Sequence, residues 1–186
     1  MLRVLEALRS GQLKASALTA RGVSQVLGKT TGALYHHHGS LDGFLHRVAQ
    51  AGFAELGASL GRTLEHQGSV EDVAAAFVAF GLDNPELHFL MFEKRYDWSS
   101  LRETGALPQT MPGLTLWNAL VATLQARGVA EPELTARLLY AGLHGLVSLG
   151  ISGRANVARI DIPDRAMALD LARRLARRLL QANAVT

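Results

Sequence analysis

The chain has 186 residues, a formal net charge of +3 and no cysteine. The lack of cysteine excludes disulfide-stapled folds and cysteine-ligated zinc or redox sites, and it suits a reducing cytoplasm. Leucine and alanine greatly outnumber the β-branched residues, so the composition predicts an all-α protein.

A first helix is expected over the first ten residues, because apolar residues recur there at helical spacing and Gly11 follows them. Two inward-facing sets fit this spacing, namely Leu2, Leu5 and Leu8, or Val4 and Leu8. We expect this helix to pack across the two helices that follow it.

Two short helices separated by a glycine turn are predicted next. The first runs from Thr19, a predicted N-cap, to Leu27, and Gly28 ends it. The second runs from Thr30, another N-cap, to about His37. This order is typical of a helix-turn-helix, whose second helix lies in the major groove of DNA.

The residues of this segment resemble the DNA-binding signature of TetR-family transcriptional regulators. The matching residues are Leu18, Thr19, Arg21, Val23, Leu27, Gly28, Thr30, Gly32, Leu34, Tyr35, His37, Gly39, Ser40 and Leu45. Three positions depart from the pattern. The family usually has an aromatic residue at the position of His38, a lysine at Leu41 and an apolar residue at Lys29.

The resemblance implies that a dimer binds a palindromic double-stranded DNA operator, with the protein most often acting as a repressor. The expected DNA-binding residues are Thr19, Arg21, Lys29, Thr30, Thr31, Gly32, Ala33, Tyr35, His36 and His37. Of these, the outward side of the second helix holds Thr31, Gly32, Ala33 and His36, which we expect to face base edges. By the resemblance, the residues expected at phosphates are Thr19, Arg21, Thr30, Tyr35 and His37.

The charge distribution agrees with this interpretation. Residues 1–50 carry six basic and two acidic side chains, a net charge of +4, and the remaining residues carry −1. A phosphate-facing surface requires such an excess, although an ordinary solvated surface would also fit it.

The rest of the chain is predicted to be helical with one loop. Ser40 is expected to cap a long helix that ends near Leu64 and that, by the resemblance, carries a signal between the two parts of the protein. Further helices are expected at 69–82, 84–96, 114–127, 133–151 and 164–182, with a loop at 97–113. We therefore expect a DNA-binding domain at 1–50 and a helical ligand-binding and dimerisation domain at 51–186.

Segments 79–92 and 143–153 resemble ligand-domain motifs of one TetR subgroup. This favours a small, mostly apolar effector inside the second domain, although an aromatic cluster is also compatible with an ordinary core. The predicted ligand-binding residues are Phe77, Phe80, His88, Phe89, Phe92, Tyr96, Trp98, Trp117, Tyr140 and His144.

The last two helices, 133–151 and 164–182, carry apolar stripes that favour a homodimer, or alternatively a plain core. The first stripe consists of Leu138, Ala141, Gly142, Gly145, Leu146 and Leu149. The second consists of Ala168, Leu171, Ala172, Leu175, Leu179 and Ala182. Basic residues opposite the second stripe would also suit a membrane surface, an interpretation that its lack of aromatic anchors disfavours.

Other chemistries find little support. The adjacent histidines His36, His37 and His38, with His46, point in different directions on a helix, so a structural or DNA-contacting role is favoured over a metal site. No catalytic or cofactor motif is visible, and we expect neither an enzyme nor a cofactor. Met1 leads into an amphipathic pattern and no apolar run of about 20 residues follows, so we expect a cytoplasmic protein without a membrane span. The alternative function is a degenerate regulator that binds DNA weakly and acts through a protein partner.

Overall fold

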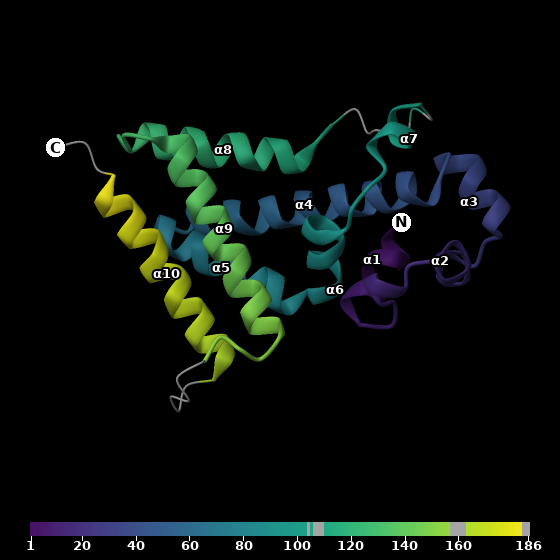
Figure 1. The fold of residues 1–186 in the computed structure, drawn as a ribbon, viewed down its shortest axis with the longest axis horizontal. Coiled ribbons are helices and arrows are strands. Elements are labelled where there is room, and N and C mark those ends of the chain that lie inside the picture. The colour runs from purple at the N-terminus through teal and green to yellow at the C-terminus, as the bar shows by residue number, and fades with distance from the viewer. Residues whose placement is uncertain (104, 106–109, 157–162, 184–186) are drawn as a thin grey trace. The chain divides into compact units, whose positions relative to one another are not determined.

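The structure of the protein is a computed structural model that describes residues 1–103, 105, 110–156 and 163–183. All regular secondary structure within these ranges is helical (Figure 1), which confirms the all-α prediction. The chain forms two compact units. Unit 1 contains Met1–Glu55 and Asn84–Gly113, and unit 2 contains Leu56–Asp83 and Leu114–Thr186.

Unit 1 begins with three short helices, as the sequence predicts, and a 3-10 turn. These elements are α1 (Leu2–Arg9), η1 (Ala15–Ala17), α2 (Ala20–Leu27) and α3 (Thr31–His38). The first part of α4 (Leu41–Glu65) follows. The unit is completed by α6 (Pro85–His88), the π-helix η2 (Phe89–Glu93), α7 (Trp98–Glu103) and the first two residues of α8 (Pro112–Ala126).

The structure shows which residues of α1 face the core of unit 1. Val4, Leu5 and Leu8 are at most 2% exposed, whereas Leu2 is 71% exposed. The alternative that turned Leu2 inward is therefore wrong. Because Leu5 lies beside Val4 and Leu8 on one broad face, that face can meet both α2 and α6.

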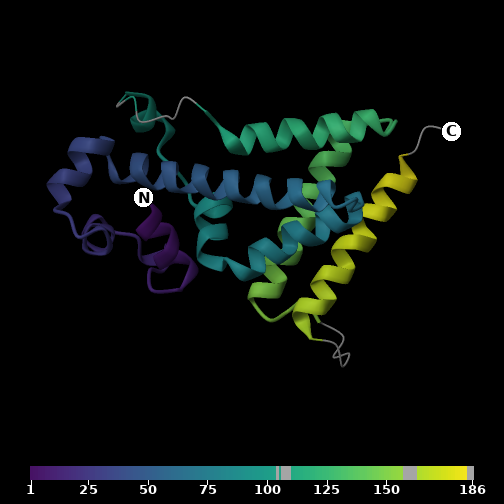
Figure 2. The ribbon, with the colours of Figure 1, turned by 180° about the vertical axis from the view of Figure 1, so that it is seen from behind.

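Residues 84–113 pack within unit 1 on the first 55 residues. Helix α1 contacts α6, and the two opposite views show these helices side by side (Figures 1 and 2). Gly52 lets α4 pack closely against α6 and η2, since a β-carbon at this position would lie 2.7 Å from Met91 Sδ and 3.0 Å from Leu87 Cδ1. The compact unit thus extends well beyond residues 1–50.

Two predictions for this region are corrected. The helix expected at 84–96 is a single α-helical turn followed by the π-helix, and it ends at Glu93. The loop expected at 97–113 contains α7, because Asp97 Oδ1 accepts a hydrogen bond of 3.1 Å from Ser99 N–H and Leu101 is fully buried. Positions 104 and 106–109 of that predicted loop lie outside the described residues.

Unit 2 contains the end of α4, then α5 (Val70–Asp83), most of α8, α9 (Pro132–Ile151) and α10 (Asp164–Ala182). Helix α5 is capped by reciprocal bonds, in which Asp72 N–H donates to Ser69 Oγ at 3.2 Å and Ser69 N–H donates to Asp72 Oδ2 at 3.1 Å. These helices confirm the ranges predicted for 69–82, 114–127, 133–151 and 164–182 to within two residues.

Helix α10 packs on α5 and α9 through its alanines. Ala168 and Ala172 are fully buried within the chain, together with Ala176. The prediction that Ala168 and Ala172 belong to a subunit interface is therefore wrong, because small side chains at this spacing bring α10 close to its own neighbours. Arg173 and Arg165 add ion pairs to Asp72 at 3.3 Å and Asp83 at 2.6 Å.

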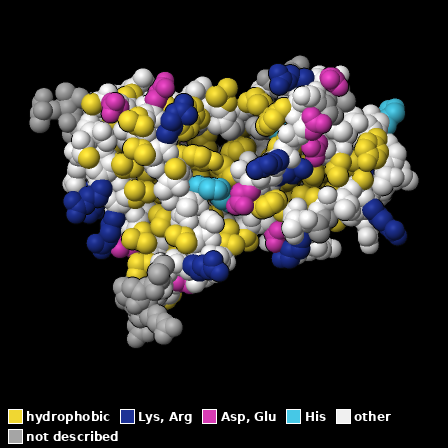
Figure 3. All heavy atoms as spheres, viewed as in Figure 1, with side chains coloured by type: hydrophobic (Ala, Val, Ile, Leu, Met, Phe, Trp, Pro, Cys, Tyr) yellow, Lys and Arg dark blue, Asp and Glu magenta, His cyan; other side chains and the backbone are white. Residues whose placement is uncertain are grey.

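Helix α9 keeps an apolar face outside the core of unit 2. By length and composition it could cross a membrane, a test that core helices of soluble proteins also pass, and no other helix of the described ranges meets it. Its exposed residues include Leu134, Leu138, Leu149 and Ile151, which are 40–48% exposed. Hydrophobic side chains line this helix on the face shown in Figure 3.

Candidate nucleic-acid interface

Helix α2 is held in place by a cap at its start and a left-handed residue at its end. Thr19 Oγ1 accepts a hydrogen bond of 3.1 Å from Gly22 N–H, as predicted. Gly28 ends the helix with φ 65°, a conformation that glycine adopts without strain. Val23 is fully buried and anchors the helix.

Helix α3 begins and ends by the same means. Thr30 Oγ1 accepts a hydrogen bond of 3.2 Å from Ala33 N–H, and Gly39 follows the helix with φ 71°. Leu34 is its buried anchor at 3% exposure. The remaining side chains of this short helix are therefore turned towards solvent or the edge of the unit.

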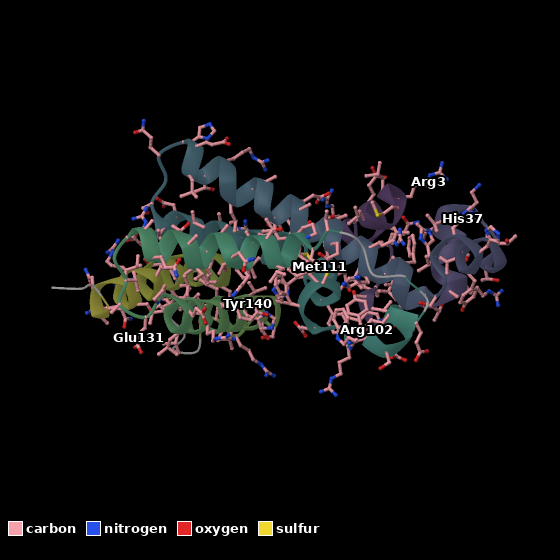
Figure 4. All side chains as sticks on the ribbon, turned by 90° about the horizontal axis from the view of Figure 1, so that it is seen from above. Arg3, His37, Arg102, Met111, Glu131 and Tyr140 are labelled. Carbon is pink, nitrogen blue, oxygen red and sulfur yellow. The ribbon has the colours of Figure 1, made fainter. Side chains whose placement is uncertain are left out.

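The predicted DNA-binding residues lie at the start of α2, in the turn and on α3. Nine are exposed, and only Ala33 is half-buried. The exposed nine are Thr19, Arg21, Lys29, Thr30, Thr31, Gly32, Tyr35, His36 and His37. His37 and Arg3 both project outward from unit 1 (Figure 4).

Glycine and arginine placement leaves room for a close, positively charged contact. A β-carbon at Gly32 would meet only Thr30 Oγ1, at 3.9 Å, so the fold itself does not require glycine there. A β-carbon at Gly28 would lie 3.8 Å from Arg3 Nη1, which places that guanidinium beside the turn. The surface around Gly32 can therefore approach another backbone closely.

The basic residues of unit 1 divide into two groups. Lys14 pairs with Glu86 at 3.0 Å, Lys94 pairs with Asp42 at 2.9 Å, and Arg9 pairs with Glu55. In contrast, Arg3, Arg21 and Lys29 form no ion pair with another described residue. Arg47, Arg95 and Arg102 of unit 1 form no such pair either, so the unpaired positive charge includes α1, α2 and the turn without being confined to them.

His38, where the family usually has an aromatic residue, takes an aromatic position in this structure. Its ring lies 4.8 Å from the ring of Phe44, edge to face. Burial lowers the pKa of His38, and the neighbouring Arg47, His37 and N-terminal ammonium lower it further. The side chain is therefore held neutral and apolar in character at the junction of α3 and α4.

Residues 70–179 match the family model described as the tetracyclin repressor-like C-terminal domain. The chain belongs to the TetR family. A comparison with curated proteins gives no match. Family membership places the chain among transcriptional regulators, and the helix-turn-helix of unit 1 lies outside the matched residues.

The predicted ligand-binding residues of this TetR-family regulator are divided between the two units. Unit 1 holds His88, Phe89, Phe92, Tyr96 and Trp98, and unit 2 holds Phe77, Phe80, Trp117, Tyr140 and His144. In unit 1, the Phe92 ring lies 4.7 Å from His88 and 5.0 Å from Phe53. In unit 2, Tyr140 stacks on His144 at 6.0 Å, and Arg137 lies 5.4 Å from the Trp117 ring.

The histidine run does not converge on one point. Consecutive rings are 5.2 Å apart for His36 and His37 and 6.4 Å apart for His37 and His38, all edge to face. His46 instead contacts Tyr96 and Trp98. Among the described residues, no group of three or more histidine, aspartate or glutamate side chains is arranged to hold a metal ion.

The sequence did not indicate Glu86 and Gln50, two polar residues that join distant parts of unit 1. Glu86 Oε2 accepts a hydrogen bond from Ala15 N–H at 2.8 Å, and Gln50 Oε1 accepts one from Gly113 N–H at 3.4 Å. Gln50 stands in no motif, and the resemblance of segment 79–92 to a ligand-domain motif gives Glu86 no such role. Their one sequence signal is a polar residue on a largely buried helix face.

Proposed function

We propose that this TetR-family regulator binds a two-fold-symmetric DNA operator as a homodimer, as a repressor, and that a small, mostly apolar effector releases it. The observation that carries the DNA-binding part is the arrangement of α2, Gly28 and α3. Both helices are capped and anchored, while nine of the ten residues expected to touch DNA are exposed. Such a helix pair places its second helix in the major groove.

Phosphate contact makes a quantitative expectation for DNA binding. Each neutralised phosphate contributes a slope of about −0.9 in log K against log salt, so a dimer that contacts four to nine phosphates gives roughly −4 to −8. An operator is first selected from random duplexes. Its affinity is then measured by fluorescence anisotropy at salt concentrations from about 50 to about 300 mM, a range wide enough to resolve such a slope.

Matched arginines test where the contact lies. Replacing the exposed Arg21 by alanine should weaken binding to all sequences and reduce the slope by about 1 per subunit. Arg154, which is also exposed but lies in unit 2, provides the control, and its replacement by alanine should change neither quantity. Substituting Thr31 or His36 should instead alter the preferred sequence.

The same measurements separate this function from its alternative, a degenerate regulator that acts through a protein partner. If no sequence is enriched and affinity does not depend on salt, the operator proposal is wrong and the alternative gains support. Cytoplasmic location follows from the proposed function, because the operator is chromosomal DNA.

The dimer proposal is supported by the three glycines in the second half of α9. A β-carbon at Gly142 would collide with Leu175 of α10, and one at Gly150 would lie 2.5 Å from Leu82 of α5. A β-carbon at Gly145 would meet nothing within 4 Å. Packing inside the chain therefore accounts for two glycines and leaves Gly145 on an open apolar face.

The same face has the composition of a subunit interface. Leu138 and Leu149, on either side of Gly145, are 48% and 40% exposed. A stripe of exposed leucines around a glycine allows two helices to approach closely. We propose that α9, together with Leu171, Leu175 and Leu179 of α10, packs against the same two helices of a second subunit.

The effector proposal rests on the aromatic residues around the π-helix η2. Irregular π-turns inside helices are frequent at binding sites, and here the turn brings Phe92 against His88 and Phe53. A ligand that prefers one of two dimer geometries needs a coupling free energy of only about 1–3 kcal/mol to lower operator affinity at least several-fold.

Trp98 and Trp117 provide the test for an effector, because one tryptophan lies in each unit. Hydrophobic candidate compounds should change tryptophan emission at the concentrations that dissociate the operator complex. A compound that releases DNA without changing the emission of either tryptophan would contradict binding near these residues.

A further inference from the structure

His46 is a buried histidine in unit 1 with aromatic rings on two sides. It lies on α4 and is 2% exposed. Its ring centroid is 5.3 Å from Tyr96 and 5.3 Å from Trp98, edge to face in both cases. A neutral imidazole suits this environment, whereas an imidazolium would be poorly solvated in it.

The hydrogen bonds of Gln50 determine which nitrogen of His46 carries the proton. Gln50 Oε1 accepts a hydrogen bond from Gly113 N–H at 3.4 Å, and Gln50 Nε2 lies 3.2 Å from His46 Nε2. Because the amide nitrogen can only donate, His46 Nε2 must accept and the ring proton must be on Nδ1. Nδ1 is buried and has no hydrogen-bond partner among the described residues.

Gly113 is held closely against α4 at the same place. A β-carbon on Gly113 would lie 3.2–3.4 Å from three carbons of the Phe53 ring. Gln50 and Phe53, one helical turn apart, thus contact the second residue of α8. The hydrogen bond from Gly113 also satisfies one of the unpaired N–H groups at the start of that helix.

The charged groups around His46 do not favour its protonation. Arg47 is its neighbour on α4, and burial together with Arg47 holds the pKa of His46 below its ordinary value. Asp42, the nearest acid on α4, is engaged by Lys94 at 2.9 Å and by Asp97 N–H at 3.3 Å.

The segments packed against the ring contribute Tyr96, Asp97 and Arg102. Tyr96 donates its hydroxyl hydrogen to Leu90 O at 2.9 Å, and burial raises its pKa, so it stays neutral. On α7, the Nε of Arg102 donates to Trp98 O at 3.3 Å, and the carboxylate of Asp97, between Tyr96 and Trp98, accepts from Ser99 N–H at 3.1 Å. The residues at 110–113 contribute no charge.

We propose that His46, Gln50 and Gly113 form a proton-sensitive joint in unit 1. When a proton from solvent binds to His46 Nε2, two donors face each other, and the Gln50 amide must turn over to offer Oε1 to the imidazolium. The turned amide then presents its NH2 group to Gly113 N–H, which loses its acceptor. Acidification thereby releases the first residues of α8 from α4.

The joint lies where the chain leaves unit 1, since Leu114 begins unit 2. Its opening requires no DNA and no effector, so it is independent of the proposed function. A regulator with such a joint would respond to intracellular acidification through the segment between its two units.

Trp98 provides an optical readout of the joint. The substitution Trp117→Phe leaves Trp98 as the only tryptophan, and an imidazolium in contact with an indole quenches its emission. We expect the emission to fall in one titration step with a midpoint below pH 6.5, the ordinary value for histidine. The further substitution His46→Gln should abolish that step.

Gln50→Glu is the decisive variant. A carboxylate can accept from Gly113 N–H and from a protonated His46 Nε2 at the same time, and an adjacent opposite charge raises a histidine pKa by about 1–3 pH units. The midpoint should therefore move above its wild-type position by at least about one pH unit. The joint should also remain closed when His46 is protonated in this variant.

The Gly113 amide reports whether the contact opens. In wild type, its protection from hydrogen exchange should be lost through the His46 titration, which NMR can follow directly without any substitution in the joint. In Gln50→Glu the protection should persist. An unchanged midpoint in Gln50→Glu, or Gly113 protection that does not follow the His46 titration, would overturn the proposal.

Discussion

Glu86 of α6 accepts a hydrogen bond of 2.8 Å from the backbone N–H of Ala15, 71 residues earlier in the chain. Its other carboxylate oxygen lies 3.0 Å from Lys14 Nζ. These two bonds lower the pKa of Glu86 even though its burial opposes the change. One side chain thus links α6 to the turn that precedes the helix-turn-helix.

Two substitutions of Glu86 should therefore lower the stability of unit 1 by different amounts. Glu86→Ala removes the acceptor of the buried Ala15 N–H, and an unsatisfied buried donor costs about 1–3 kcal/mol. Glu86→Gln keeps an acceptor of the same length, so it should lose only the charge interaction with the exposed Lys14, worth about 1 kcal/mol or less. Urea unfolding at pH 7.5 measures both. Equal losses in the two variants would show that the hydrogen bond to Ala15 contributes nothing.

The N-cap of α3 permits a separate stability prediction. Thr30→Ala removes the acceptor for Ala33 N–H and should lower the free energy of unfolding by about 0.5–2 kcal/mol. Thr30→Ser retains the hydroxyl and should stay close to wild type. If the two variants unfold at the same urea concentration, the cap does not stabilise the folded helix.

Local signals explain why so much of the fold could be predicted from the sequence. Thr19, Gly28 and Thr30 determine helix ends through contacts with residues a few positions away, and the structure has those contacts. The apolar periodicity of α5, α9 and α10 likewise requires no knowledge of what each helix packs against.

The parts that sequence reasoning missed depend on distant partners. Whether Ala172 faces a copy of the chain or its own α5 is decided by tertiary packing, since both give the same stripe. The extension of unit 1 to residues 84–113 depends on contacts such as Glu86 with Ala15. The π-helix and α7 were missed because one extra residue in a turn, or an aspartate cap inside a glycine-rich stretch, barely changes the pattern.

Gly145→Leu should affect the proposed dimer and the single chain in opposite directions. The substitution removes a glycine from a helix interior, which by itself favours the folded chain by about 0.8–1 kcal/mol. On the open face of α9, however, a leucine side chain would separate two apposed helices. We expect dissociation at micromolar concentration, measured by sedimentation or light scattering, with weaker operator binding and an unchanged helix-turn-helix in unit 1.

Gly57 provides the matched control for this experiment. A β-carbon at Gly57 on α4 would also meet nothing within 4 Å, so Gly57→Leu has the same helix-propensity gain. It should leave the oligomeric state and operator affinity unchanged. Dissociation in both variants, or in neither, would contradict an interface at Gly145.

The last prediction concerns acid sensitivity at the junction of α3 and α4, where the His38 ring packs on Phe44. Burial and Arg47 lower the pKa of His38 in the folded state relative to 6.5 in the unfolded chain. The unfolded state therefore binds the proton first, and stability that is fully present above about pH 6.5 is lost as the pH falls towards the folded-state pKa. His38→Phe restores the aromatic residue typical of the family and cannot titrate, so its unfolding free energy should fall less between pH 7.5 and 5.5 than that of wild type. Parallel pH profiles for wild type and His38→Phe would show that His38 is not held neutral by its surroundings.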